Sequence, residues 1–325
     1  VFECSQPLSL GGVRVAASLS IGVAFSAPGD DRAALLRHAD IAMYAAKRGA
    51  STFRVFDASL EQSSTVQLSL SATLPDAIAN GEFELHYQPK VDLRSTRVVG
   101  AEGLARWNHP EYGLLGPEAF LDVATMSESA SVFARTMIEQ AVRMAERLIA
   151  EEHPLKIAVN VTMRALQEHD FSPWLFATLG RHGVAPKWLV LELTERDVRD
   201  PSSQAMATLH ELTTAGVELS IDDFGTGHSS MQRLRDLDVA EMKVDRSFVE
   251  GITESSVDRE IVASIIALAS RLGYRVVAEG VEHAAHAEAL TEMGCPIAQG
   301  HLFDSALPPD EFLRTVVSVE SPPGR

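Results

Sequence analysis

From about residue 80 onward, short apolar segments alternate with segments whose apolar residues follow a helical period. The apolar segments have the length and β-branched content of strands. Such alternation predicts a largely parallel sheet, because a crossover helix lets each strand start in the same direction. The expected strands lie at 83–91, 97–104, 156–162, 188–193, 216–222, 239–245, 275–279 and 296–300. The expected helices lie at 131–151, 164–182, 203–215, 229–236, 256–273 and 284–293.

Eight strands in about 240 residues are typical of a closed (β/α)8 barrel. The first two expected strands lack a full crossover helix between them, so one of the two is expected to run antiparallel to the rest. The predicted fold class is therefore α/β, with a TIM-like (β/α)8 barrel that contains one antiparallel strand. A partial α/β segment is expected before it.

That earlier segment, residues 13–56, reads as strand, helix and strand. The helix runs from Arg32 to Arg48, with Gly49 placed to end it, and a short strand follows from Thr52 to Phe56. Residues 57–67 are rich in Ser and Gln and suit a linker or the start of a connecting helix. Pro75 suits either a first helical position or a kink. Because the sequence begins at Val1 and enters a strand pattern abruptly, we expect a fragment of a longer polypeptide.

The composition restricts the partners. The chain has 325 residues, 46% of them hydrophobic, and a net charge of −17. Such an acidic chain is unsuited to DNA or RNA backbones, although divalent cations can still bring a small nucleotide to an acidic site. The only cysteines, Cys4 and Cys295, have no metal-type or redox-type spacing, which indicates a reducing cytosol. No signal peptide is evident, and the longest apolar helix candidate, 261–269, is too short to span a bilayer.

Asp222 and Asp223 stand side by side at the end of an apolar strand. Two adjacent carboxylates there lose hydration and repel each other, and bound cations are the simplest remedy. Polar residues end most of the other strands too, and in a parallel barrel they would converge on one face. An oxygen-rich set without His or Cys favours Mg²⁺ or Mn²⁺ over zinc. The set is Glu102, Asn160, Glu192, Asp222, Asp223, Lys243, Glu279 and Gln299.

Each residue of this set also has an ordinary structural interpretation. The two aspartates suit caps for the following turn. Lys243 suits a surface lysine, or a salt bridge with Asp245 on the same strand face. Gln299 suits a loop amide. The joint pattern of one polar residue on nearly every strand favours a common site.

The ordered motifs resemble those of EAL-domain cyclic di-GMP phosphodiesterases over residues 70–318. Residues 13–56 resemble the end of a GGDEF domain, through Ser20–Val23 and Ala39–Lys47, without the Gly-Gly-Asp/Glu-Glu-Phe loop. We therefore expect a truncated GGDEF-like segment at 1–56, a linker at 57–69, the barrel at 70–318 and a tail at 319–325. The EAL motifs are Tyr87-Gln88-Pro89, Glu102-Gly103-Leu104-Ala105-Arg106-Trp107, Val159-Asn160-Val161, Glu192-Leu193-Thr194-Glu195, Asp222–Gly227, Lys243-Val244-Asp245, Ala278–Glu282 and Gln299-Gly300.

The resemblance implies hydrolysis of one phosphodiester bond of cyclic di-GMP to linear pGpG by metal-activated water. It implies two ions, Mg²⁺ or Mn²⁺, with Asp222 shared between them. The implied metal ligands are Glu102, Asn160, Glu192, Asp222, Asp223 and Glu279. The implied catalytic residues are Glu102, Lys243 and Glu279, and the implied substrate-binding residues are Gln88, Leu104, Arg106 and Gln299. Glu195, Thr226 and Ser229 are implied to support the loop after the fifth parallel strand, with Glu195 pairing with its hydroxyls.

Three departures from the family pattern stand out. Gly103 replaces the Ala of the family's name motif, which loosens the backbone beside Glu102. His228 replaces a usual Tyr, and His301 lies in a segment that departs from the pattern expected to contact guanine. The resemblance further implies a homodimer through the barrel, a missing upstream sensor or full GGDEF domain, and a bacterial cytoplasmic location. The alternative functions are a cyclic di-GMP receptor without turnover and a signalling scaffold.

Overall fold

The structure is a computed structural model that describes residues 8–10, 13–15, 20–26, 31–48, 53–199, 201–226 and 237–319. Chain contacts divide it into two compact units, residues 1–73 and 74–325. Within the described residues, none of the helices has the length and apolar character that a membrane crossing requires. The expected helix at 229–236 lies outside the described residues, as do His228 and Ser229.

The first unit contains the strand, helix and strand that the sequence predicted. β3 (Ile21–Val23) pairs in parallel with β4 (Phe53–Val55), and α1 (Arg32–Arg48) connects them. β1 (Leu8–Leu10) and β2 (Val13–Val15) form a separate antiparallel pair. Helix α2 (Ala58–Ala79) covers the stretch expected as a linker or connecting helix, and Pro75 lies inside this helix rather than at its first position.

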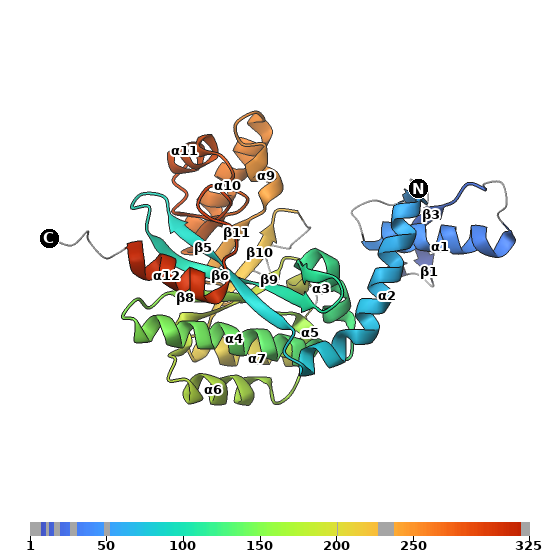
Figure 1. The fold of residues 1–325 in the computed structure, drawn as a ribbon. Coiled ribbons are helices and arrows are strands. Elements are labelled where there is room, and N and C mark those ends of the chain that lie inside the picture. Colours follow the sequence, from blue (N-terminus) through green and yellow to red (C-terminus); the bar gives the residue numbers. More distant parts are fainter. Residues whose placement is uncertain are drawn as a thin grey trace. The chain divides into compact units, whose positions relative to one another are not determined.

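Eight strands of the second unit close into a barrel (Figure 1). β5 pairs antiparallel with both β6 and β13, whereas the remaining neighbours are parallel, so the predicted antiparallel strand is the first one. The short β7 (Gly113–Leu115) extends the sheet beside β6. The barrel strands are β5 (Phe83–Asp92), β6 (Val98–His109), β8 (Lys156–Asn160), β9 (Leu189–Thr194), β10 (Glu218–Phe224), β11 (Glu241–Val244), β12 (Arg275–Ala278) and β13 (Ile297–Ala298).

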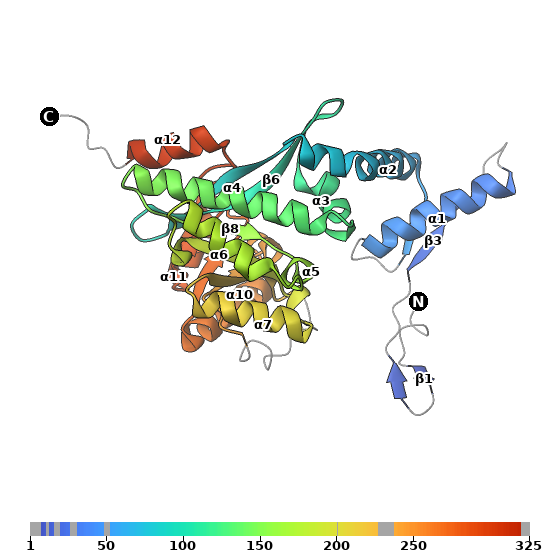
Figure 2. The same ribbon diagram turned by 90° about the horizontal axis from the view of Figure 1, so that it is seen from below.

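Helices cover the outside of the barrel (Figures 1 and 2), with α4 packed against β8, α7 against β10 and α10 against β12. Their ends follow the sequence: the Ser255 hydroxyl accepts from the Asp258 amide at the start of α10, and Gly273 ends it with a φ of 78°. The helices are α3 (Pro117–Met126), α4 (Ala130–Ala150), α5 (Met163–Leu166), α6 (Phe171–Arg181), α7 (Ser203–Thr214), α9 (Arg246–Glu250), α10 (Ser256–Leu272), α11 (Ala284–Glu292) and α12 (Pro309–Val319).

One expected helix was wrong, and the helices α3, α9 and α12 were not predicted. The helix expected at 164–182 is two helices, α5 and α6. Pro173 lies in the first turn of α6, where its missing N–H is harmless, whereas a continuous helix through it would lose a hydrogen bond and clash. Helix α3 was not predicted, although Pro117 occupies its first turn, which is a favoured position for proline.

Candidate active site

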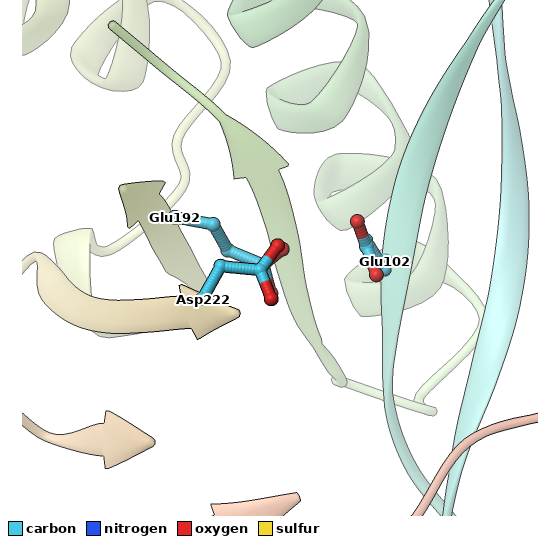
Figure 3. Close-up of side chains that lie close together, drawn as sticks. All are labelled: Glu102, Glu192 and Asp222. Carbon is cyan, nitrogen blue, oxygen red and sulfur yellow. The ribbon is translucent and has the colours of Figure 1, made fainter. Parts of the chain in front are cut away.

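Carboxylates from different strands meet inside the barrel. Glu102 on β6, Glu192 on β9 and Asp222 on β10 point into a common space (Figure 3), with one oxygen of each within 4.8 Å of the others. Asp222, Asp223 and Glu279 form a second group of the same dimensions. The structure therefore brings together acids that lie as much as 177 positions apart in the sequence, from Glu102 to Glu279.

Lys243 lies at the centre of these acids. Its Nζ is 3.0 Å from Glu102 Oε2, 2.9 Å from Glu192 Oε2, 3.1 Å from Asp222 Oδ2 and 2.6 Å from Glu279 Oε1. The suggested pairing with Asp245 was wrong, because Asp245 lies beyond the end of β11 and caps α9 by accepting from the Ser247 amide. Lys243 is buried and serves as the shared countercharge of the site.

Two amides complete the contacts of Glu102. Asn160 Nδ2 donates to Glu102 Oε1 at 2.9 Å, and Gln299 Nε2 donates to Glu102 Oε2 at 2.8 Å. Gln299 Nε2 also donates to Gln88 Oε1 at 2.9 Å, and Gln88 in turn donates to the Asp304 carbonyl. Gln299 Oε1 is buried and has no hydrogen-bond partner among the described residues. Buried acceptors are usually paired with a donor, and a ligand bound in the site would supply one to Gln299 Oε1.

Burial and repulsion between the carboxylates raise the pKa values of these acids, and the nearby ammonium groups lower them. Burial, strengthened by the nearby Glu192 carboxylate, raises the pKa of Glu102 to about 7. Burial also raises the pKa of Glu279 well above its usual range, although Lys243 opposes this. Burial alone would raise the pKa of Glu192, but the ammonium groups of Lys243 and Lys90 outweigh it and lower that pKa to about 2. Two lysines do not offset the five acids of the site, so the site favours additional positive charge.

The two aspartates lie where β10 ends in an irregular turn. Asp223 has a positive φ of 55°, and its amide donates to Asp222 Oδ1 at 2.8 Å. Burial and the neighbouring Asp222 raise the pKa of Asp223 to about 6. A left-handed backbone at a non-glycine residue is uncommon and is found disproportionately at functional sites.

Glu195 ties the following turn to the site. Its Oε2 accepts from the Gly225 amide at 2.9 Å, and its own amide donates to the Asp222 carbonyl at 2.9 Å. The Thr226 hydroxyl donates to the Asp223 carbonyl. The expected pairing of Glu195 with the loop hydroxyls stays a prediction, because Ser229 lies outside the described residues. Glu195 therefore links β9 directly to the turn that carries the aspartates.

The expected substrate-binding residues of β6 lie further along that strand. Arg106 is half-buried and donates to the Ala105 carbonyl at 2.9 Å, and burial lowers the pKa of its guanidinium. Leu104 is half-buried on the same face as Glu102 and Arg106. His301 is largely exposed, with its Nδ1 4.0 Å from Glu282.

Two buried charged residues of the barrel interior were not predicted as part of the site. Lys90 on β5 and Glu241 on β11 are each about 4% exposed. Both could have been found from the two-residue period of a strand, which places alternate side chains on the same face. Lys90 follows the predicted Gln88 by two residues, and Glu241 precedes the predicted Lys243 by two.

Residues 71–306 match the model of the EAL domain. The chain belongs to the EAL domain family. The signaling protein YkoW of Bacillus subtilis (strain 168) is 35% identical over 318 residues, which span 97% of this chain and 40% of YkoW. The bifunctional diguanylate cyclase/cyclic di-GMP phosphodiesterase MucR of Pseudomonas aeruginosa is 35% identical over 319 residues, which span 97% of this chain and 47% of MucR. The chain thus spans less than half the length of these two relatives.

Among solved structures, the PaMucR phosphodiesterase in complex with c-di-GMP is similar to this EAL domain. It is 34% identical, and the likeness covers 75% of this chain and 99% of that chain with a TM-score of 0.71. The mixed barrel with its antiparallel first strand is therefore the fold of the family, as the sequence predicted.

Proposed function

We propose that this chain is a metal-dependent phosphodiesterase that hydrolyses one phosphodiester bond of cyclic di-GMP to give linear pGpG. The observation that carries the proposal is the presence of two clusters of three acids, which share Asp222 and lie around Lys243. Membership of the EAL domain family and the phosphodiesterases named among its relatives support it.

The side chains present suit two divalent cations, and we propose Mg²⁺ or Mn²⁺. The donors are oxygens of carboxylates and amides, which these hard cations prefer. The unpartnered Gln299 Oε1 offers a further acceptor for a coordinated water. One ion would be held by Glu102, Asn160, Glu192 and Asp222, and the other by Asp222, Asp223 and Glu279. When bound, such cations polarise the phosphate and supply an acidified water.

The chain's own residues orient the substrate and move the proton. Lys243 Nζ, which contacts the acids of both groups, is placed to donate to the attacking water or to the developing negative charge. Glu279 lies 2.6 Å from Lys243 Nζ, burial raises its pKa, and it is suited to accept a proton from that water. Gln88 and Gln299 form one hydrogen-bonded amide pair beside Glu102 and suit the ligand or water. Arg106 would give up its hydrogen bonds to backbone carbonyls and donate to a phosphate oxygen, with Leu104 packing beside it.

We propose further that residues 1–56 are the end of a GGDEF-like domain without its catalytic loop, followed by the connecting stretch 57–69, the barrel at 70–318 and a tail. The β3–α1–β4 arrangement is compatible with this assignment. The homodimer, the upstream domain and the bacterial cytoplasmic location stay predictions.

Product analysis tests the proposed activity. The purified chain is incubated with cyclic di-GMP in Mg²⁺, in Mn²⁺ and in EDTA, and the nucleotides are separated by chromatography. We expect pGpG with either cation and none in EDTA. Glu102→Gln should abolish the product while the fold survives, and Glu288→Gln, an exposed site on α11, serves as the matched control.

Absence of pGpG from the unaltered chain with both cations would contradict the proposed activity. Calorimetry with cyclic di-GMP in Ca²⁺ then separates the alternatives. Binding without turnover would identify a receptor, and absence of binding would favour a scaffold.

A further inference from the structure

A row of charged side chains of alternating sign runs along the barrel interior, from the carboxylate site toward the opposite end of the strands. Each member lies within ion-pair distance of the next, and six different strands contribute. The order from the site downward is Lys243, Glu192, Lys90, Glu241, Arg275, Glu218 and Lys156. The proposed mechanism uses only the first two members.

Lys90 lies one layer deeper than the acids on the antiparallel strand. Its partner across the sheet is Gly100, whereas Gln88 is opposite Glu102. Lys90 Nζ donates to Glu192 Oε1 at 2.9 Å and to Glu241 Oε1 at 2.7 Å. A buried ammonium with two buried carboxylate partners has little freedom to leave them, since each partner would lose one of its countercharges.

The two oxygens of the Glu192 carboxylate have different partners. Oε1 faces downward and accepts from Lys90, whereas Oε2 faces the site, 2.9 Å from Lys243 Nζ. Glu192 is completely buried. A carboxylate held through one oxygen presents only the other to a neighbouring group, in a fixed direction.

Glu241 is in turn held by two other residues. Its Oε1 accepts from the Ser220 hydroxyl at 3.2 Å, and its Oε2 lies 3.5 Å from Arg275. Glu218 connects Arg275 to Lys156. These contacts therefore fix the position of Lys90 from the side away from the carboxylate site.

We infer that Lys90 is a positioning residue for the cation site: it holds Glu192 Oε1, so that Glu192 binds a divalent cation through Oε2 alone. The inference rests on the proposed metal site. Glu241 is the residue that keeps Lys90 in place. Loss of Lys90 removes the hydrogen bond to Oε1 and frees the Glu192 carboxylate to rotate, and cation affinity falls.

Mn²⁺ binding to the full 325-residue chain tests this inference. The chain is stripped with EDTA, and Mn²⁺ affinity is measured by titration calorimetry and by electron paramagnetic resonance without nucleotide. The variants are Lys90→Met and the double variant Lys90→Met/Glu241→Gln, in which the second change removes the charge of the acid that loses its contact with Lys90. We expect both to bind Mn²⁺ about 10- to 100-fold more weakly, as is typical when the partner of a metal ligand is removed.

A destabilised control separates positioning from general stability. Leu179→Ala removes a buried leucine of α6, which packs outside the barrel, and should lower the melting temperature without changing Mn²⁺ affinity. Equal Mn²⁺ affinity in the double variant and the unaltered chain would overturn the role of Lys90. Weakened Mn²⁺ binding in Leu179→Ala to the same extent would overturn it as well.

The same titration distinguishes failure of the inference from failure of the metal site. Absence of Mn²⁺ binding in the unaltered chain would contradict the proposed cations, and with them this role for Lys90. Tight binding in the unaltered chain and in both Lys90 variants would contradict the role of Lys90 alone.

Discussion

Replacement of Lys243 by methionine should reveal how strongly the acids depend on a cation. Lys243 contacts four carboxylates at 2.6 to 3.1 Å and is about 1% exposed. Methionine has nearly the same length and no charge, so Lys243→Met leaves the acids without their shared countercharge. Removal of one partner from a buried ion pair costs about 3–5 kcal/mol. For a domain of this size we expect the melting temperature in EDTA to fall by about 6–20 °C.

The assay is thermal unfolding at pH 8 in EDTA and in excess Mn²⁺. Because a divalent cation replaces the lost charge, Mn²⁺ should raise the melting temperature of Lys243→Met more than that of the unaltered chain. Lys187→Met, an exposed lysine 5.0 Å from the Trp188 ring, is the matched control and should lose at most about 1 kcal/mol. If Lys243→Met and Lys187→Met melt together in EDTA, or if Mn²⁺ adds no extra stability to Lys243→Met, the reasoning is refuted.

Three further changes test other parts of the site. Folding raises the pKa of Glu102 to about 7 and that of Asp223 to about 6, so above pH 4.5 the folded cation-free protein holds more protons than the unfolded chain. Its melting temperature in EDTA should therefore fall as the pH rises from about 4.5 to 7. A rise of the melting temperature over this range would contradict the prediction. Gly103→Ala brings a methyl carbon within 2.9 Å of Leu85 Cδ1, so calorimetric unfolding should show a loss of about 1 kcal/mol, and an increase would exclude this crowding. Glu195→Ala removes the acceptor of the Gly225 amide and should lower turnover about 10- to 100-fold, whereas Glu195→Gln retains an acceptor and should lose less; equal losses would disprove the role of that bond.

The sequence predicted the barrel well because strand and helix periods are local properties. The reversed first strand followed from the missing crossover helix between residues 91 and 97. The break at Pro173 and the existence of α3 were missed, because a proline in a helical pattern permits both a start and an interruption. Boundaries of this kind depend on packing partners that are distant in the sequence.

The site was predicted less completely than the fold. The acids and Lys243 were recognised because strand ends of a barrel converge, but the individual contacts of Lys243 across the barrel interior were not predicted. Lys90 and Glu241 lie below the strand ends, where a lysine in a strand pattern reads as a surface residue. Only the closed barrel shows that these two charges face each other.

The reversed direction of β5 decides where the chain enters the barrel. Helix α2 ends at Ala79, and β5 begins at Phe83, opposite Trp107 near the far end of β6. In an all-parallel barrel the first strand would begin at the rim remote from the acids, whereas here it begins at the rim that carries them. The end of α2 is therefore joined by three residues, 80–82, to the rim that carries the acids, on the strand that holds Gln88 and Lys90.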